Sequence, residues 1–218
     1  MTKVKICCIG SVPEAKLAIG SGATAIGLVS EMPSGPGVIP ESLIAEISAA
    51  VPPPTTTVLL TSCTDAASIV AQQKRCAVRA IQLVDTMEPT VIRELKRALP
   101  GIQLIQVIHV GSGESVVEAI ETAAAGVDAL LLDSGNQNLP VKHLGGTGRT
   151  HDWSISARIV AAVDVPVYLA GCLNPANVGE AIRQVRPHGV DVCSGVRTDD
   201  HLDNEKLFRF MEEVETGN

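Results

Sequence analysis

The segment Leu130-Leu131-Leu132-Asp133-Ser134 is the first of three stretches with the same pattern in the second half of the chain. The second is Leu169-Ala170-Gly171-Cys172-Leu173-Asn174-Pro175, and the third is Val190-Asp191-Val192-Cys193-Ser194-Gly195-Val196. In each stretch an apolar run is followed by small or polar residues and then by a helical pattern. A parallel barrel builds an anion-binding rim from such strand ends and helix N-termini. Three stretches in succession therefore favour a barrel over a single phosphate-binding turn.

Short apolar runs alternate with helical patterns eight times, and the runs are nearly continuously apolar, as parallel strands covered on both faces are. The expected strands are Val4–Ile9, Ala25–Val29, Thr57–Thr61, Ala80–Leu83, Leu104–Val110, Ala129–Leu132, Val167–Ala170 and Gly189–Cys193. The units recur about every 25–30 residues, which fits a (β/α)8 barrel better than an open doubly wound sheet. We predict an α/β protein with a single (β/α)8 TIM barrel domain over residues 1–218.

Helix start signals accompany these strands. Ser11-Val12-Pro13-Glu14 matches a capping box with a proline in the first turn. Asn174-Pro175 predicts the start of a helix over Ala176–Val185, and Asp203 is the expected cap of the last helix. The proline- and glycine-rich stretch Met32–Pro40 follows the second strand, so we expect it on the catalytic face of the barrel.

Composition limits the functional classes. The 218 residues are 45% hydrophobic but only 2% aromatic, so aliphatic side chains must fill the core. A net charge of -7 without a basic stripe argues against nucleic acid or an anionic membrane as partner. The six cysteines and five histidines show no metal-ligand spacing. We expect a cytoplasmic protein that binds no metal and has neither a signal peptide nor a membrane span.

Cys7 lies near the end of the first expected strand. Strand alternation puts it on the same face as Lys5 and puts Cys8 on the other face. If the first face points into the barrel, a thiol lies at the catalytic end above an ammonium group, which favours the thiolate. A small buried hydrophobe is nonetheless the commoner role of a cysteine seen alone. We expect Cys8 to pack against the surrounding helices.

Two aspartates fall on apolar strands. Asp133 ends the sixth strand, where it either forms an Asx turn or lies over the barrel mouth. Desolvation at the mouth would raise its pKa, as a general acid requires. Asp191 lies inside the eighth strand, where an ionisable group needs a partner. A functional role and a buried structural hydrogen bond are both open for Asp191.

Glycine-rich segments beside these aspartates predict loops that hold a ligand. The run 145–148 follows the Asp133 strand and favours a loop that closes over substrate rather than a plain flexible connection. The loops after the seventh and eighth strands are the recurrent phosphate site of barrels. The expected phosphate ligands are Gly171, Cys172, Asn174, Ser194 and Gly195.

Taken together, these motifs resemble the phosphoribosylanthranilate isomerase family. The resemblance runs over nearly the whole chain and rests on Lys5-Ile6-Cys7, Ala25-Ile26-Gly27, Leu132-Asp133-Ser134, Gly145-Gly146-Thr147-Gly148 with Asp152-Trp153, Leu169-Ala170-Gly171 through Asn177-Val178, and Asp191 through Val196. It implies an Amadori rearrangement, an aldose–ketose isomerisation in tryptophan biosynthesis, without a cofactor. It also implies that Cys7 is the general base and Asp133 the general acid.

The end of the site that would bind anthranilate departs from the family. Met32–Gly37 lacks the arginine usually found after the second strand, and Val84-Asp85 replaces the usual His-Gly. Arg197 stands where the family usually has glutamate, and we expect it to bind the anthranilate carboxylate instead. The full set of expected substrate contacts, besides the phosphate ligands, is Lys5, Gln82, Gly145, Gly146, Thr147, Asp191 and Arg197.

The sequence leaves two alternative functions open. Because the anthranilate end is altered, a related barrel that isomerises another phosphorylated sugar is the first alternative. A barrel that only binds a phosphorylated metabolite is the second, but Cys7 and Asp133 argue against it because binding alone needs neither. The expected partner is a small phosphorylated sugar rather than a nucleic acid or a membrane, and the expected state is a monomer or a homodimer.

Overall fold

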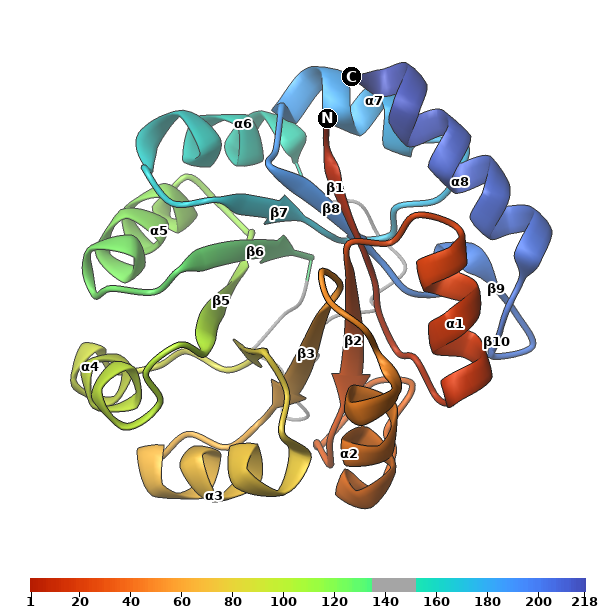
Figure 1. Cartoon of the computed structure of the whole chain (residues 1–218). Coiled ribbons are helices and arrows are strands. Elements are labelled where there is room, and N and C mark those ends of the chain that lie inside the picture. The colour runs from red at the N-terminus through yellow and green to blue at the C-terminus, as the bar shows by residue number, and fades with distance from the viewer. Residues whose placement is uncertain (135–151) are drawn as a thin grey trace.

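The computed structural model describes residues 1–134 and 152–218. In these ranges eight parallel strands form a closed barrel, with β8 paired back to β1, and helices surround it (Figure 1). The strands are β1 Lys3–Ile6, β2 Ala25–Val29, β3 Thr56–Thr61, β4 Ala80–Leu83, β5 Gln103–His109, β6 Ala129–Asp133, β7 Val167–Leu169 and β8 Gly189–Val192. The helices are α1 Val12–Gly20, α2 Glu41–Ala50, α3 Ala66–Cys76, α4 Pro89–Ala98, α5 Glu114–Ala124, α6 Trp153–Ala162, α7 Val178–Val185 and α8 Asn204–Gly217. The predicted (β/α)8 barrel is confirmed.

The first strand is shorter than its sequence predicts. We expect a strand up to Ile9, but β1 ends at Ile6. Cys8 adopts a left-handed backbone conformation with φ of +61°, which a residue with a Cβ rarely takes and which cannot continue a strand. The two cysteines therefore lie just beyond the strand rather than on it, and the alternation rule no longer fixes where Cys8 points.

Two of the predicted helix caps are confirmed. Ser11 Oγ accepts a hydrogen bond from Glu14 N at 3.3 Å at the start of α1. The Glu14 carboxylate reaches back to Gly10 N at 2.9 Å, so it completes the capping box one residue earlier than the usual pattern. At the start of α8, Asp203 Oδ1 accepts from the backbone amides two and three residues later, both at 3.0 Å.

Aliphatic side chains form two layers, one inside the barrel and one between the strands and the helices. Alternate strand residues point inward, as Val58 and Leu60 on β3 and Ala129 and Leu131 on β6 do. The residues between them, such as Leu59, belong to the larger layer that contacts the helices. Small inward residues alternate with larger ones, so the narrow interior is filled without aromatic rings, as the composition requires.

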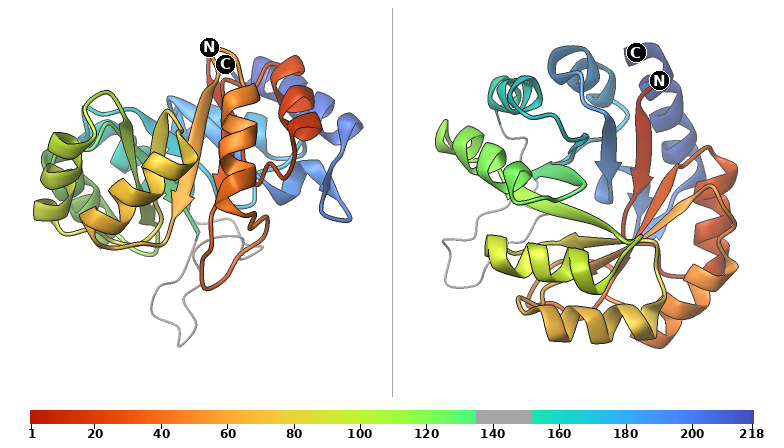
Figure 2. Two further views of the ribbon diagram at one scale, coloured as in Figure 1. Left: turned by 60° about the horizontal axis from the view of Figure 1, so that its bottom comes forward. Right: turned by 60° about the vertical axis from the view of Figure 1, so that its left-hand side comes forward.

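The two ends of the barrel differ. The termini lie side by side at one end (Figure 2), where Thr2 N donates to Asn218 Oδ1 at 2.7 Å. The loop between β2 and α2 projects from the opposite end. That opposite end is formed by the carboxyl termini of the strands, where barrel enzymes place their active sites. Among the helices that the structure describes, none is long and apolar enough to cross a membrane.

Arg197 ties the last part of the chain to the loop after β1. It begins the short strand β9 (Arg197–Thr198), which pairs antiparallel with β10 (His201–Leu202). Its Nη1 lies 3.0 Å from Glu14 Oε1, and its Nη2 donates to the carbonyl oxygens of Cys7 and Cys8 at 3.2 and 2.6 Å. Only 8% of Arg197 and 17% of Glu14 are exposed, so the ion pair is shielded from water.

Replacing Arg197 with alanine is expected to destabilise the fold. The change leaves Glu14 without its cationic partner and two carbonyl groups without a donor, which together cost about 3 kcal/mol in a shielded site. Urea unfolding measures the difference. Arg183→Ala is the control, because Arg183 pairs with Glu180 on an exposed helix surface, where the loss is about 0.5 kcal/mol or less. Equal free energies of unfolding for the two variants would contradict the structural role of Arg197.

Candidate active site

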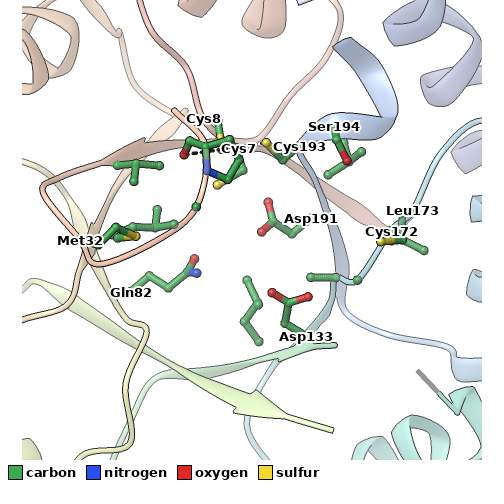
Figure 3. Close-up of a pocket in the computed structure, with 18 of the residues that line it drawn as sticks. Cys7, Cys8, Met32, Gln82, Asp133, Cys172, Leu173, Asp191, Cys193 and Ser194 are labelled. Carbon is green, nitrogen blue, oxygen red and sulfur yellow. Dashed lines mark hydrogen bonds between the residues drawn. The ribbon is translucent and has the colours of Figure 1, made fainter. Parts of the chain in front are cut away.

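A cavity of about 150 Å³ lies inside the barrel at the carboxyl-terminal ends of the strands. Of the predicted site residues, Cys7, Gln82, Asp133, Gly171, Cys172, Asp191 and Ser194 line it. The stretch after β2 that the sequence places on this face also contributes, through Met32 and its neighbours. Figure 3 shows Cys7, Cys8 and Cys193 on one side of the open centre and Asp133 on the other.

A buried ion pair lies below the cavity. Lys5 on β1 is in register with Asp191 on the adjacent β8, and Lys5 Nζ lies 2.9 Å from Asp191 Oδ1. Burial alone would lower the pKa of Lys5, but the attraction of Asp191 and Cys7 outweighs it, so that pKa is raised above its ordinary value. Lys5 therefore keeps its positive charge. Asp191 has the buried partner that its position in an apolar strand demands, and it also faces the cavity.

Cys7 lies beside this pair at the cavity wall. Cys7 N donates to Val192 O at 2.8 Å, which holds the residue against β8 after β1 has ended. A hydrogen bond from Cys8 is the largest cause of a lowered pKa at the Cys7 thiol, and Lys5 lowers the pKa further, against the effect of burial. The thiolate of Cys7 therefore forms more readily than that of a free cysteine.

Gly27 makes room for this arrangement, although our reading of the sequence assigns it no place in the site. Lys5 pairs with Ala25 on β2, so Gly27 lies two positions farther along, beside Cys7. A Cβ at Gly27 would lie 2.7 Å from Cys7 Sγ and 3.1 Å from Lys5 Nζ, closer than side chains tolerate. The only sequence signal is a glycine inside an apolar strand, which indicates the close approach of another group.

Asp133 ends β6 and faces the cavity from the side opposite Cys7 (Figure 3). Its Oδ1 accepts a hydrogen bond from Ser134 N at 2.7 Å. The carboxyl group of Asp133 therefore makes a local backbone contact and also lies at the barrel mouth. Burial raises the pKa of Asp133 by more than the Ser134 amide and His109 lower it. A carboxyl group with a raised pKa keeps its proton to higher pH, as a general acid requires.

Gln82 on β4 contributes an amide group to the same cavity. The residue is 4% exposed, and its Oε1 makes no hydrogen bond to the described part of the chain. Leaving a buried acceptor unpaired costs roughly 1–3 kcal/mol. A hydroxyl group of a bound molecule could offset that cost by donating to Oε1.

The loops after β7 and β8 meet beside the cavity. Gly171 and Cys172 follow β7 with left-handed φ angles of +86° and +56°, and a short 3-10 helix, Ser194–Val196, follows β8. A Cβ at Gly195 would lie 2.0 Å from Leu173 O, so glycine is what allows the two loops to touch. Gly195 is therefore a packing residue, and it is not among the residues that line the cavity.

The prediction that Asn174 begins a helix is wrong. The helix that follows begins at Val178 and not at Ala176, and Asn174 closes the turn before it. Its Oδ1 accepts from Ala176 N at 2.9 Å, and its own N–H donates to Asn177 Oδ1 at 2.8 Å. Its Nδ2 also donates to Cys172 O at 3.3 Å. Asn174 is not among the residues that line the cavity, and its assignment as a phosphate ligand stays a prediction.

Two more expectations need correction. Cys8 lies in the cavity wall rather than against the helices, because its left-handed backbone turns the side chain toward Cys193, with the two Sγ atoms 2.7 Å apart. Arg197 does not line the cavity, because its guanidinium group faces Glu14 and the backbone of the loop after β1, so its role as a carboxylate ligand is not retained.

The remaining predicted contacts, Gly145, Gly146 and Thr147, lie outside the described residues. Within residues 1–134 and 152–218, no group of three or more histidine, cysteine, aspartate or glutamate side chains is arranged to hold a metal ion. The described lining of the cavity offers thiol, carboxyl, amide and hydroxyl groups.

Known proteins resemble the chain over nearly its whole length. The family model of N-(5'-phosphoribosyl)anthranilate (PRA) isomerase matches residues 4–213. The N-(5'-phosphoribosyl)anthranilate isomerase of Methanocella arvoryzae is 35% identical over 215 residues, which cover 98% of each chain.

Solved structures give the same family. A phosphoribosylanthranilate isomerase from Thermotoga maritima matches with a TM-score of 0.85 at 27% identity, covering 99% of both chains. Another structure of this enzyme, in complex with reduced 1-(o-carboxyphenylamino)-1-deoxyribulose 5-phosphate, matches with a TM-score of 0.82 at 26% identity and covers 99% of both chains.

Proposed function

The chain belongs to the phosphoribosylanthranilate isomerase family, and we propose how its own residues carry out the reaction of that family. It catalyses the Amadori rearrangement of N-(5'-phosphoribosyl)anthranilate, an aldose–ketose isomerisation in tryptophan biosynthesis. Our assignment is Cys7 as general base and Asp133 as general acid. The observation that carries it is a single cavity with a thiol of lowered pKa on one side and a carboxyl group of raised pKa on the other.

The acid acts first in this mechanism. Protonated Asp133 donates its proton to the ring oxygen of the ribose, the bond from C1 to that oxygen breaks, and the nitrogen lone pair forms an iminium ion. The thiolate of Cys7 then removes the proton from C2, and the electron pair of that bond moves to give an enolamine, which tautomerises to the ketose. Each positioned acid or base contributes roughly 100- to 10,000-fold to the rate.

At one and the same pH, the mechanism needs Asp133 to be protonated and Cys7 to be deprotonated. Lys5, which its ion pair with Asp191 keeps charged, stabilises the thiolate of Cys7. Burial raises the pKa of Asp133 and so favours its protonated form. In this proposal Lys5 lowers the pKa of the general base, Cys7. Lys5 does not line the cavity, so we do not assign it the direct substrate contact that the sequence predicts.

We place the substrate phosphate where the loops after β7 and β8 meet, near Gly171, Cys172 and Ser194. These residues line the cavity at the position where barrel enzymes commonly hold phosphate. Gln82 lies between this end and the β2 side of the cavity, where its unpaired Oε1 can accept a hydrogen bond from a sugar hydroxyl.

The anthranilate ring would then lie on the apolar wall formed by Val29, Met32 and Leu60. In Figure 3, Met32 is across the cavity from Cys172 and Ser194, so a ligand with a phosphate and a ring at opposite ends fits this direction. The described residues that line the cavity include no arginine. Apolar contact, rather than a bidentate carboxylate pair, is the means of holding the ring that this part of the chain offers.

We further propose that the protein acts on this small phosphorylated substrate in the cytoplasm, as a monomer or a homodimer. All six cysteines are free. Free cysteines, two of them with their sulfur atoms 2.7 Å apart, suit a reducing compartment.

Cys7→Ala should fold normally and lose at least about 100-fold in kcat, because it removes the group that takes the C2 proton. Loss of phosphoribosylanthranilate fluorescence measures turnover, and a thermal unfolding curve checks the fold. Cys63→Ala is the matched control, since Cys63 lies on the loop after β3 and does not line the cavity. Near-normal turnover in Cys7→Ala would remove Cys7 from the mechanism.

Asp133→Asn should abolish most turnover while largely preserving affinity for the reduced product analogue. Asparagine keeps the size of the side chain and can still accept from Ser134 N, but it has no acidic proton to donate. Calorimetric titration with the analogue separates the two effects. If affinity falls in step with kcat, Asp133 is a binding residue rather than the acid.

Gly195→Ala should raise KM for the phosphorylated substrate by about tenfold or more, because a Cβ would push the β8 loop away from Leu173 O and spread the phosphate site. Gly111→Ala is the control, since a Cβ at Gly111 meets no atom within 4 Å. A crystal of the unaltered protein soaked in phosphate should hold the anion near Gly171 and Ser194. An anion bound elsewhere, with these loops empty, would refute the phosphate assignment.

A further inference from the structure

Two thiols face each other where the barrel closes. Cys8 follows β1, and Cys193 follows β8, the strand that pairs with β1. Cys193 Sγ donates a hydrogen bond to Cys8 Sγ at 2.7 Å, although the two residues are 185 positions apart in the sequence. Figure 3 shows them beside each other on one side of the cavity. The mechanism above uses neither thiol.

The backbone holds both sulfur atoms in place. Cys7 N donates to Val192 O at 2.8 Å, so the residues just before the two thiols are hydrogen-bonded neighbours. Cys8 then takes a left-handed conformation with φ of +61°, which turns its side chain toward Cys193. The Cys8 thiol also donates to Pro36 O at 3.7 Å, on the loop after β2. Glycine would adopt this conformation more easily, so the thiol is what cysteine adds at position 8.

We propose that Cys8 and Cys193 are a redox-active pair: a hydroperoxide that enters the cavity converts them into a reversible disulfide, and this bond ties the first strand of the barrel to the last. The sulfur atoms of a disulfide lie about 2.05 Å apart. The two thiols reach that distance by a movement of about 0.65 Å, the difference between the bonded distance and the present 2.7 Å. A reducing compartment keeps such a pair as thiols until an oxidant is present.

Hydrogen peroxide is the simplest oxidant of this class. Both thiols line the cavity, but Cys193 is half-buried whereas Cys8 is only 7% exposed, so the oxidant meets Cys193 first. The sulfur of Cys193 attacks one peroxide oxygen, the O–O bond breaks, and the thiol proton leaves with the second oxygen as water, which gives a sulfenic acid. The sulfur of Cys8 then attacks the oxidised sulfur, the S–O bond breaks, and the proton of Cys8 leaves with the hydroxyl group as a second water. The two thiols lose two electrons and two protons in all, and the peroxide takes them up.

The other cysteines do not offer the same bond. Cys7 and Cys8 are consecutive, so their Cα atoms are about 3.8 Å apart, less than the roughly 4.4 Å at which disulfides begin to occur. Cys172, on the loop after β7, lies apart from the pair in Figure 3. Cys63 and Cys76 are not among the residues that line the cavity.

Peptide mapping tests the bond. The reduced protein is freed of reductant and treated with hydrogen peroxide, its remaining thiols are blocked with iodoacetamide under denaturing conditions, and its tryptic peptides are identified by mass spectrometry. The peptide that carries Cys7 and Cys8 should be joined to the one that carries Cys193, with two hydrogen atoms fewer than the separate peptides, and dithiothreitol should separate them. Cys8→Ala and Cys193→Ala should both lose the joined peptide. Cys7→Ala, a matched change one residue away in the same peptide, should keep it.

Two outcomes of the mapping would overturn the proposal. A joined peptide that survives in Cys8→Ala would assign the bond to Cys7. Oxidation that leaves Cys8 and Cys193 open to alkylation would show that the pair does not react. Neither measurement depends on turnover, so the result is independent of the isomerase assignment.

Thermal unfolding supplies the second readout. A bond between residues 185 positions apart closes most of the chain into a loop and so restricts the unfolded state. Oxidation should therefore raise Tm by about 5 °C or more, dithiothreitol should reverse the rise, and Cys193→Ala should show no such rise. Cys63→Ala is the control and should behave as the unaltered protein does, because Cys63 does not line the cavity. Equal Tm values for the oxidised and the reduced protein would overturn the proposal that the bond ties the barrel together.

Discussion

An ammonium and a carboxylate group 2.9 Å apart, where β1 meets β8, set the conditions for the rest of this barrel. The interior around them is aliphatic, and an unpaired charge in such a medium is strongly unfavourable. Lys5 keeps its charge because Asp191 stands opposite it in the strand register. A slip of one residue between the strands would turn one of the two groups toward the helices and leave the other unpaired. The register of β1 and β8, the strand pair that closes the barrel, therefore also keeps Lys5 and Asp191 paired inside it.

This one pair acts differently on the acid and on the base. Lys5 is in contact with Cys7 and favours its thiolate. At Asp133 the two partners oppose each other, since Lys5 lowers the pKa and Asp191 raises it, and burial is the dominant cause of the shift. The two partners also oppose each other at Cys7, but there Lys5 adds a hydrogen bond to its charge, so its lowering of the pKa exceeds the raising by Asp191. The same residues can therefore favour a thiolate on one wall and a neutral carboxyl group on the other.

The sequence predicts the barrel and the positions of Asp133 and Asp191 because these depend on local rules that hold within strands. Cys7 also faces the cavity as predicted, although it lies one residue beyond the end of β1. The rules fail where the strands have ended. Alternation puts Cys8 outside, but its positive φ brings it inside. A polar residue before proline has the same local signal as a helix cap and as a turn, so Asn174 is misassigned. The direction of the Arg197 side chain is set by Glu14, which is 183 residues away in sequence, and motif position carries no information about that contact.

The charge of the cavity constrains how it can hold an anionic ligand. Its described lining residues include Asp133 and Asp191 but no lysine or arginine, and Lys5 is already paired below it. At the phosphate site that we propose, the described residues therefore offer backbone N–H groups and hydroxyl groups rather than side-chain cations. Such dipoles are fixed by the loops and need no reorganisation when the ligand arrives. Small residues after β7 and β8 suit the phosphate site that we propose, since a loop without bulky side chains lets its backbone approach the ligand.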